Sequence, residues 1–176
     1  MLRYIVTYGV IAGVVVGVPL SAMTLTMSGH AMMSYGMLIG YLTMLIALSA
    51  VFLAIKRHRD VDLGGVIKFW PALMLGLGVS AVAGVIYVIA WEVSCAVAHA
   101  DFAGAYARAM IAEQEAKGVS GVALARFKAE MDQFKVQYAN PLWRWPETFA
   151  EIFPVGVIVS LVSAALLRNS RFMPAR

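Results

Sequence analysis

Long stretches without a charged side chain constrain the fold of this chain more than any other feature of its sequence. Residues 4–55 contain no Asp, Glu, Lys or Arg. Residues 69–91 and residues 152–167 form two further uncharged runs. One helical crossing of a bilayer needs roughly 20 apolar residues, so the first run is long enough for two crossings and a turn. The pattern therefore predicts an integral membrane protein with four transmembrane helices.

The composition agrees with a membrane protein. Hydrophobic residues make up 61% of the chain and charged residues 14%, whereas about 25% of the residues in soluble domains are charged. The net charge of +4 is small, so we expect the lipid bilayer and not nucleic acid as the partner. Met1–Arg3 and the following apolar residues also fit a signal peptide. Because the apolar stretch continues through Met27, we expect an uncleaved first span.

The expected fold is an all-α, integral membrane four-helix bundle, in one domain of residues 1–176. The spans are expected at about residues 4–27, 33–55, 66–95 and 149–167. Trp70 and Trp91 are 21 positions apart, which is about 32 Å of helix at 1.5 Å per residue. This length matches a hydrocarbon core of about 30 Å. Trp143 and Trp145 precede the fourth span, so all four tryptophans fall where aromatic belts are expected.

The connection between spans three and four has the pattern of a helical hairpin at about residues 101–138. Its second half carries an apolar stripe at alternating spacings of three and four, which is typical of one face of a helix. The stripe consists of Leu124, Phe127, Met131, Phe134 and Tyr138. Two interpretations remain open. The stripe packs on the protein's own spans or on lipid headgroups, or it is an interaction face for a partner.

The basic residues predict the orientation. Arg3, the connection at residues 56–68 and the C-terminal tail hold eight of the fourteen Lys and Arg residues. Basic residues in short connections favour the cytoplasmic side. We therefore expect a bacterial inner (cytoplasmic) membrane protein with both termini in the cytoplasm and the hairpin on the extracytoplasmic side.

Each expected span carries small residues four positions apart, a spacing that lets helix backbones approach closely in a membrane. These helix-packing candidates are Gly9, Gly13 and Gly17, then Gly36 and Gly40, then Gly76, Ser80 and Gly84, and finally Gly156, Ser160 and Ala164. The spacing indicates a tightly packed bundle. It leaves open whether the closest face lies within one chain or in a homo-oligomer.

Few side chains could carry chemistry. Glu92 and Glu151 lie near the ends of spans three and four, and they are the candidates for a charge relay, although neither is expected in the middle of the membrane. His30, His58 and His99 are scattered, and no HExxH, P-loop or GxSxG motif occurs. We therefore expect no catalytic residue, no cofactor and no metal site.

Several segments together resemble the DUF4199 family of bacterial multi-pass membrane proteins, whose name marks a domain of unknown function. The resemblance lies in Gly40-Tyr41, Leu48-Ser49, Phe52, Ile55-Lys56-Arg57, Arg59-Asp60, Gly64 to Phe69, Ile86-Tyr87-Val88, Trp91-Glu92, Glu151 to Gly156, Ser160 to Ala164 and Leu167-Arg168. It implies the architecture and no activity. Two functional classes remain: a non-enzymatic assembly, anchoring or regulatory component with a membrane-protein partner or a second copy, or a small transporter or channel subunit.

Overall fold

The computed structural model describes residues 1–26, 30–98 and 101–174, and for Thr26 and residues 30–37 it describes the backbone alone. The described part of the chain forms six helices: α1 (Leu2–Thr26), α2 (His30–Asp62), α3 (Phe69–Ala98), α4 (Phe102–Ala116), α5 (Gly121–Tyr138) and α6 (Pro141–Leu167). The predicted turn at residues 28–30 lies largely outside the described residues. The prediction of an all-α fold is confirmed.

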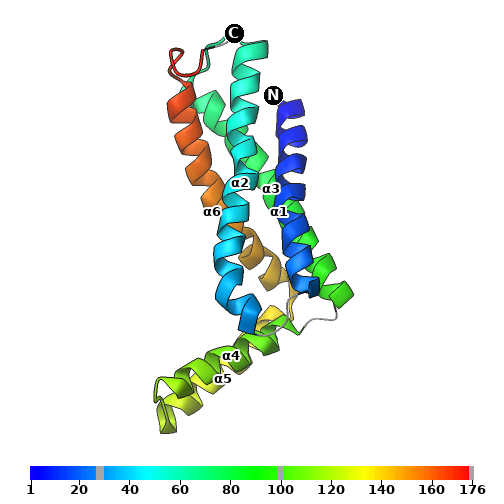
Figure 1. Ribbon diagram of the computed structural model, residues 1–176, viewed down its shortest axis with the longest axis vertical. Helices are drawn as coiled ribbons and strands as arrows, with labels where there is room; N and C mark the ends of the chain where they lie inside the picture. The colour runs from blue at the N-terminus through cyan, green and yellow to red at the C-terminus, as the bar shows by residue number, and fades with distance from the viewer. Residues whose placement is uncertain (27–29, 99–100, 175–176) are drawn as a thin grey trace.

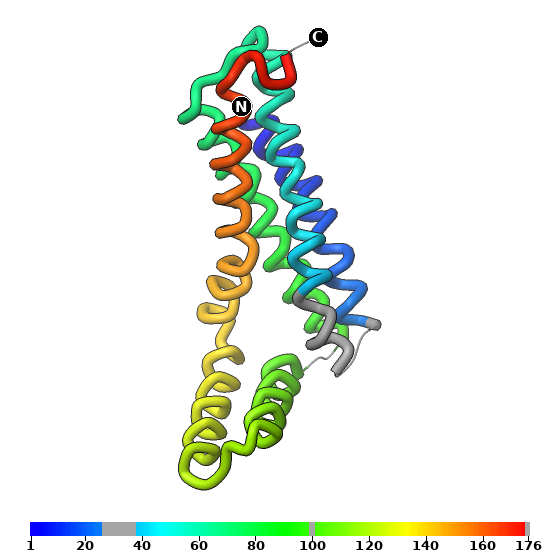
Figure 2. The backbone as a smooth tube through the Cα atoms, turned by 60° about the vertical axis from the view of Figure 1, so that its left-hand side comes forward, coloured from blue at the N-terminus to red at the C-terminus, as the bar shows by residue number. Residues whose placement is uncertain are grey.

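Helices α1, α2, α3 and α6 form an elongated bundle, with both chain termini at one end and the α4–α5 pair at the other (Figure 1). Helix α3 packs against α1 and α6, and α2 closes the other side of the bundle against the same two helices. Most side chains inside the bundle are apolar, and Leu48, Val51 and Leu75 are fully buried. Helices α4 and α5 lie side by side and extend beyond the bundle (Figure 2).

Four of the described helices are long and apolar enough to cross a membrane: Leu2–Leu25, Leu38–Asp62, Phe69–Ala98 and Pro141–Leu167. Their outer surfaces are also apolar. Val14, Ile46, Val85 and Ile158, one from each helix, are all exposed. A helix that is apolar on all sides suits a surrounding of lipid and other helices better than a surrounding of water. These helices therefore support insertion in a membrane.

Two helices extend beyond the expected spans. Helix α2 continues past the expected end at residue 55, because its charged end forms ion pairs one turn apart, Lys56 with Asp60 at 2.6 Å and His58 with Asp62 at 2.8 Å. Helix α6 begins eight positions before the expected residue 149. Its start is set by Asn140, whose side chain accepts a hydrogen bond from the Leu142 amide at 3.0 Å, as N-cap residues do.

Arg59 connects the ends of α2 and α6. Its side chain is fully buried, and its guanidinium donates to Asp60 and to the carbonyl oxygens of Leu167, Phe172 and Met173. The last carbonyls of a helix have no partner within the helix, and a basic side chain satisfies them. The basic segment after span two therefore also holds the C-terminal end of α6 in place.

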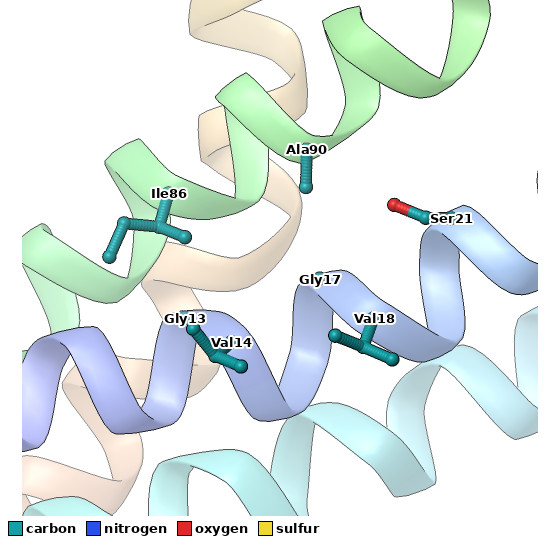
Figure 3. Close-up of a pocket in the computed structure, with 7 residues that line it drawn as sticks. All are labelled: Gly13, Val14, Gly17, Val18, Ser21, Ile86 and Ala90. Carbon is teal, nitrogen blue, oxygen red and sulfur yellow. The ribbon is translucent and has the colours of Figure 1, made fainter. Parts of the chain in front are cut away.

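Glycines allow the close contact between α1 and α3. A Cβ atom added at Gly9 would lie 2.5 Å from Cβ of Val82, and one added at Gly13 would lie 2.6 Å from Cβ of Ile86. Gly17 faces Ala90 in the same way, at 3.0 Å. Figure 3 shows Ile86 and Ala90 of α3 above the glycine side of α1. The spacing of small residues in α1 therefore corresponds to a contact within the chain.

A second close contact joins α3 and α6. Gly76 lies against Ser160, Gly156 lies against Ser80, and the two serine hydroxyls are 3.4 Å apart. Each hydroxyl also donates to a carbonyl in its own helix, four residues earlier. These two buried hydroxyls are satisfied within the bundle without water.

The remaining packing candidates differ from one another. Gly84 lies against the ring of Phe149, and Ala164 is fully buried. At Gly40 the side-chain direction is open, with no described atom within 4 Å. The close contact expected there is not seen among the described residues, because a Cβ atom added at Gly40 would point into open space. The packing of Gly36 lies outside the described side chains.

We expect Gly13→Leu to destabilise the protein by about 1–3 kcal/mol, since added atoms in a packed contact force neighbouring side chains and backbone to shift. Val14→Leu is the matched control, because Val14 is the next residue on the same helix and its side chain is half exposed. Thermal unfolding of both variants in one detergent measures the difference. Equal midpoints would contradict the assignment of this glycine face to the contact with α3.

Candidate functional site

Four helix ends meet where the hairpin joins the bundle. The end of α3, the start of α4, the end of α5 and the start of α6 supply the polar and aromatic side chains of this region, which we call the junction. Its members are Trp91, Glu92, Phe102, Tyr138 and Arg144. They come from segments up to 53 positions apart, and the following contacts bring them together.

Glu92 and Arg144 form a two-point ion pair across the junction. Nε of Arg144 lies 2.6 Å from Oε1 of Glu92, and Nη2 lies 2.6 Å from Oε2. Both side chains are largely shielded, with exposed fractions of 20% for Arg144 and 28% for Glu92. Parallel hydrogen bonds between a guanidinium and a carboxylate are stronger and more directional than bonds between neutral groups. The pair therefore ties the end of α3 to the start of α6.

Arg144 also holds the end of α5. Its Nη1 donates to the carbonyl oxygen of Tyr138 at 3.1 Å, and its Cζ lies 5.6 Å from the centre of the Tyr138 ring. A planar guanidinium can stack on an aromatic face while its edge makes hydrogen bonds. One side chain thus connects α3, α5 and α6.

Aromatic rings join the hairpin to the bundle. Trp91 of α3 donates its indole N–H to the Tyr138 hydroxyl at 2.9 Å and meets the Phe102 ring edge-on at 4.9 Å between ring centres. Phe102 contacts Tyr106, which contacts Phe134 of α5 at 5.4 Å. Aromatic pairs at such distances stabilise beyond the area that they bury. This continuous row gives the hairpin a fixed base.

Trp91 therefore does not have the aromatic-belt role that was expected for it. Its ring is buried and contacts the hairpin, so it is not a residue that faces lipid headgroups. Trp70, Trp143 and Trp145 are exposed and remain available for aromatic belts. All four tryptophans lie at similar sequence distances from a span end. Trp91 is buried and the other three are exposed because the hairpin covers Trp91.

The Tyr138 hydroxyl is a donor at the junction. Burial raises the pKa of this phenol above its usual range, and the hydrogen bond from Trp91 opposes that shift in part. The phenol consequently keeps its proton near neutral pH. Its oxygen accepts from Trp91, and its own O–H is free to donate to a further group.

A cavity of about 320 Å³ opens beside these side chains. Its size is at the lower end of the range for small-molecule sites. Two acidic and two basic side chains line it, together with rings, small apolar residues and a thiol. The lining residues are Glu92, Cys95, Ala96, Asp101, Phe102, Ala103, Lys135, Tyr138, Ala139 and Arg144.

The two carboxylates expected as a charge relay have different partners. Glu92 is paired with Arg144, whereas Glu151 accepts a hydrogen bond from the Tyr87 hydroxyl at 3.1 Å. Because the Glu92 carboxylate is bound at both oxygens by a permanent cation, a proton moving through it would have to compete with that cation. The contacts of the described residues do not connect the two carboxylates.

The apolar stripe of α5 lies half-buried in the hairpin. Phe134 contacts Tyr106, and Tyr138 contacts Phe102 at 5.5 Å, so these two rings pack against α4. Leu124, Phe127 and Met131 are half-buried as well. Other apolar side chains of α5 are more open: Val122 is 88% exposed and Val136 is 75% exposed. The more open apolar surface of α5 is thus a different face from the predicted stripe.

Among the described residues, His, Cys, Asp and Glu form no group of three or more that could hold a metal ion. Nor do the contacts described above contain a nucleophile paired with a base. The junction presents hydrogen-bond donors, acceptors and aromatic faces, which suit the recognition of a ligand.

Comparison with known proteins places the chain in a family. The model of the DUF4199 family, described as a protein of unknown function, matches residues 7–169. The chain belongs to this family. No curated protein and no solved structure matches it. The resemblance expected from the sequence is confirmed over nearly the whole chain. The family is of unknown function, so membership assigns no activity to this DUF4199 protein.

Arg144 is the junction residue of this DUF4199 protein that the sequence does not reveal. It lies 52 positions from Glu92, and no short motif connects the two. The sequence does contain one signal for this pair. Arg144 lies between Trp143 and Trp145 at the start of the last span, and Glu92 follows Trp91 at the end of the third span. Opposite charges at adjoining span ends are candidates for a pair.

We expect Glu92 and Arg144 to be energetically coupled by about 1–3 kcal/mol, as contacting charged groups are. The measurement is a double-mutant cycle with Glu92→Gln, Arg144→Gln and the double variant, followed by chemical unfolding in one detergent. Either single change leaves a charge without its partner. The double variant should therefore lose less free energy of unfolding than the two single variants lose in sum. Additive effects would show that the ion pair does not hold the junction in solution.

Proposed function

We propose that this protein is a multi-pass protein of the bacterial inner membrane, with both termini in the cytoplasm and the α4–α5 hairpin outside. The termini lie at the same end of the bundle and the hairpin at the opposite end (Figure 1). The end with the termini also carries Arg3, the basic segment at residues 56–68 and Arg168. This asymmetry favours a cytoplasmic location for that end.

Its proposed role is that of a non-enzymatic assembly, anchoring or regulatory component, which presents the hairpin to a membrane-protein partner or to a second copy. One observation carries this role. The hairpin has a fixed base in the junction, yet Val122 and Val136 remain uncovered. The two valines are 14 positions apart, close to four helical turns, so they lie on one face of α5. Exposed apolar side chains on a fixed helix suit association with a protein.

A small transporter or channel subunit is the second candidate. The contact between Tyr87 and Glu151 supports it, because both residues lie inside candidate spans. An acidic group at such a depth is expensive to place in lipid, and it commonly serves proton or ion movement. The bundle contacts of Ser80 and Ser160 favour the first candidate, since these side chains are fully buried and their hydroxyls bond to the helices themselves.

The proposed orientation predicts the result of reporter fusions. A reporter after Arg176 or within residues 56–59 should be cytoplasmic, and a reporter at Gly118, in the turn between α4 and α5, should be outside. Paired enzymatic reporters with opposite compartment requirements measure this directly. A cytoplasmic signal from the Gly118 fusion would refute the orientation or the number of spans.

A second prediction separates the two functional classes. If the protein is an association component, Val122→Asp combined with Val136→Asp should weaken self-association or partner binding, because charges replace the uncovered apolar face. The hairpin should remain folded, since both side chains point away from its packed rings. Cross-linking in native membranes, followed by sedimentation in detergent, measures association. Lys128→Gln is the matched control, because Lys128 is exposed on the same helix but lies about 100° around it from the valine face.

The complementary measurement is proton flux into liposomes that contain the purified protein. We expect wild type and Glu151→Gln to give the same flux as protein-free liposomes. Flux in wild type that disappears in Glu151→Gln would reject the association role and support the transporter.

A further inference from the structure

The cavity at the junction lies at the level expected for lipid headgroups. Trp143 and Trp145 are exposed on either side of Arg144 in the sequence, Arg144 lines the cavity, and exposed tryptophans near a span end mark the boundary between hydrocarbon and headgroups. Beyond it come polar residues of α4 and α5. Groups at this level meet the phosphates and amines of one leaflet.

Several hydrogen-bond donors at the cavity are available for an anion. Arg144 has five N–H bonds, and the contacts with Glu92 and Tyr138 use three of them. The Tyr138 hydroxyl keeps a proton to donate. Lys135 pairs with Asp132 at 2.6 Å, but both are exposed, and such surface pairs contribute little, so the ammonium can turn to a ligand. Arginine, lysine and tyrosine donors together suit a phosphate group.

The cavity also offers an acceptor for a cation. The oxygens of Glu92 are already bound by Arg144, which leaves Asp101 as the acidic lining residue that can accept further hydrogen bonds. Its Oδ1 accepts from the Gly104 amide, and its Oδ2 has only a long contact of 3.5 Å with the exposed Arg108. An ammonium group that donates N–H bonds can replace that contact. With two acidic and two basic side chains, the lining matches a ligand of zero net charge that carries both signs.

We propose that this cavity binds the headgroup of a zwitterionic phospholipid, in which a phosphodiester carries a primary ammonium, as in phosphatidylethanolamine. The phosphate meets Arg144, Tyr138 and Lys135, and the ammonium meets Asp101. A membrane lipid fits better than a free phosphoamine, because Ile89 and Val85 are exposed on α3 one and two helical turns before Glu92, on the bilayer side of the cavity, and provide an apolar path for the acyl chains. The proposal rests on insertion of the bundle in a bilayer and not on the association role.

Lipid retention by the full-length protein tests the proposal. The purified chain is incubated in mild detergent with equal amounts of phosphatidylethanolamine, phosphatidylcholine and phosphatidylglycerol, and the lipids that remain bound are quantified by native mass spectrometry. We expect about tenfold enrichment of phosphatidylethanolamine over both others, which corresponds to one charge-assisted hydrogen bond. Phosphatidylcholine lacks the N–H donors, and phosphatidylglycerol lacks the cation.

Two variants assign the two ends of the headgroup. Asp101→Asn should abolish the preference for phosphatidylethanolamine over phosphatidylglycerol while the fold is kept, because Asn is as good an N-cap for α4 as Asp. Lys135→Gln should lower the retention of both lipids. Lys128→Gln, which removes a similarly exposed ammonium on α5 away from the cavity, is the matched control and should leave retention unchanged.

Equal retention of the three lipids by wild type would overturn the proposal, as would equal effects of Lys135→Gln and Lys128→Gln. Soluble phosphoethanolamine that displaces the lipid completely at millimolar concentration would overturn the choice of a lipid over a free headgroup. Extraction of the protein from membranes by alkaline carbonate would instead show that the bundle is not inserted, which is a failure of the proposed function and is distinguishable from the others.

Discussion

The close approach of α3 to α1 and α6 is the contact on which the rest of the structure depends. In a bilayer, apolar side chains gain little by leaving lipid for another helix, so helices associate through packing and hydrogen bonds between close surfaces. Gly13 against Ile86, and Gly76 against Ser160, provide such surfaces on two sides of α3. These contacts hold the far end of α3 next to the start of α6, and the junction forms between those two ends.

The junction fixes the orientation of the hairpin relative to the bundle. Arg144 bonds to Glu92 of α3 and to the backbone of Tyr138, and Trp91 bonds to the Tyr138 hydroxyl. Partial burial strengthens these bonds, because water competes with them less. The same geometry that holds the hairpin leaves donors and an acceptor around a cavity. Attachment of the hairpin and recognition of a headgroup would therefore share Arg144 and Tyr138.

The spans were predictable from the sequence, but their ends were less so. Uncharged runs such as residues 69–91 signal a crossing because unpaired charges are expensive in lipid. Helices α2 and α6 extend beyond the expected spans because Lys56 and Asp60 pair along a helix, and because Pro141 is well suited to a first helical turn. Local sequence marks the membrane boundary, and a helix need not stop there.

Helical structure, four segments apolar enough to cross a membrane, and glycines such as Gly13 at positions where helices can touch all follow from the amino-acid sequence alone. These properties depend on hydropathy and on spacings of a few residues, which are local. The packing of the helices in space establishes which helix each glycine meets, that Trp91 is buried under the hairpin, and that Arg144 is the partner of Glu92. Such pairings depend on how helix ends meet in space, since the partners are tens of residues apart and no local pattern encodes their distance.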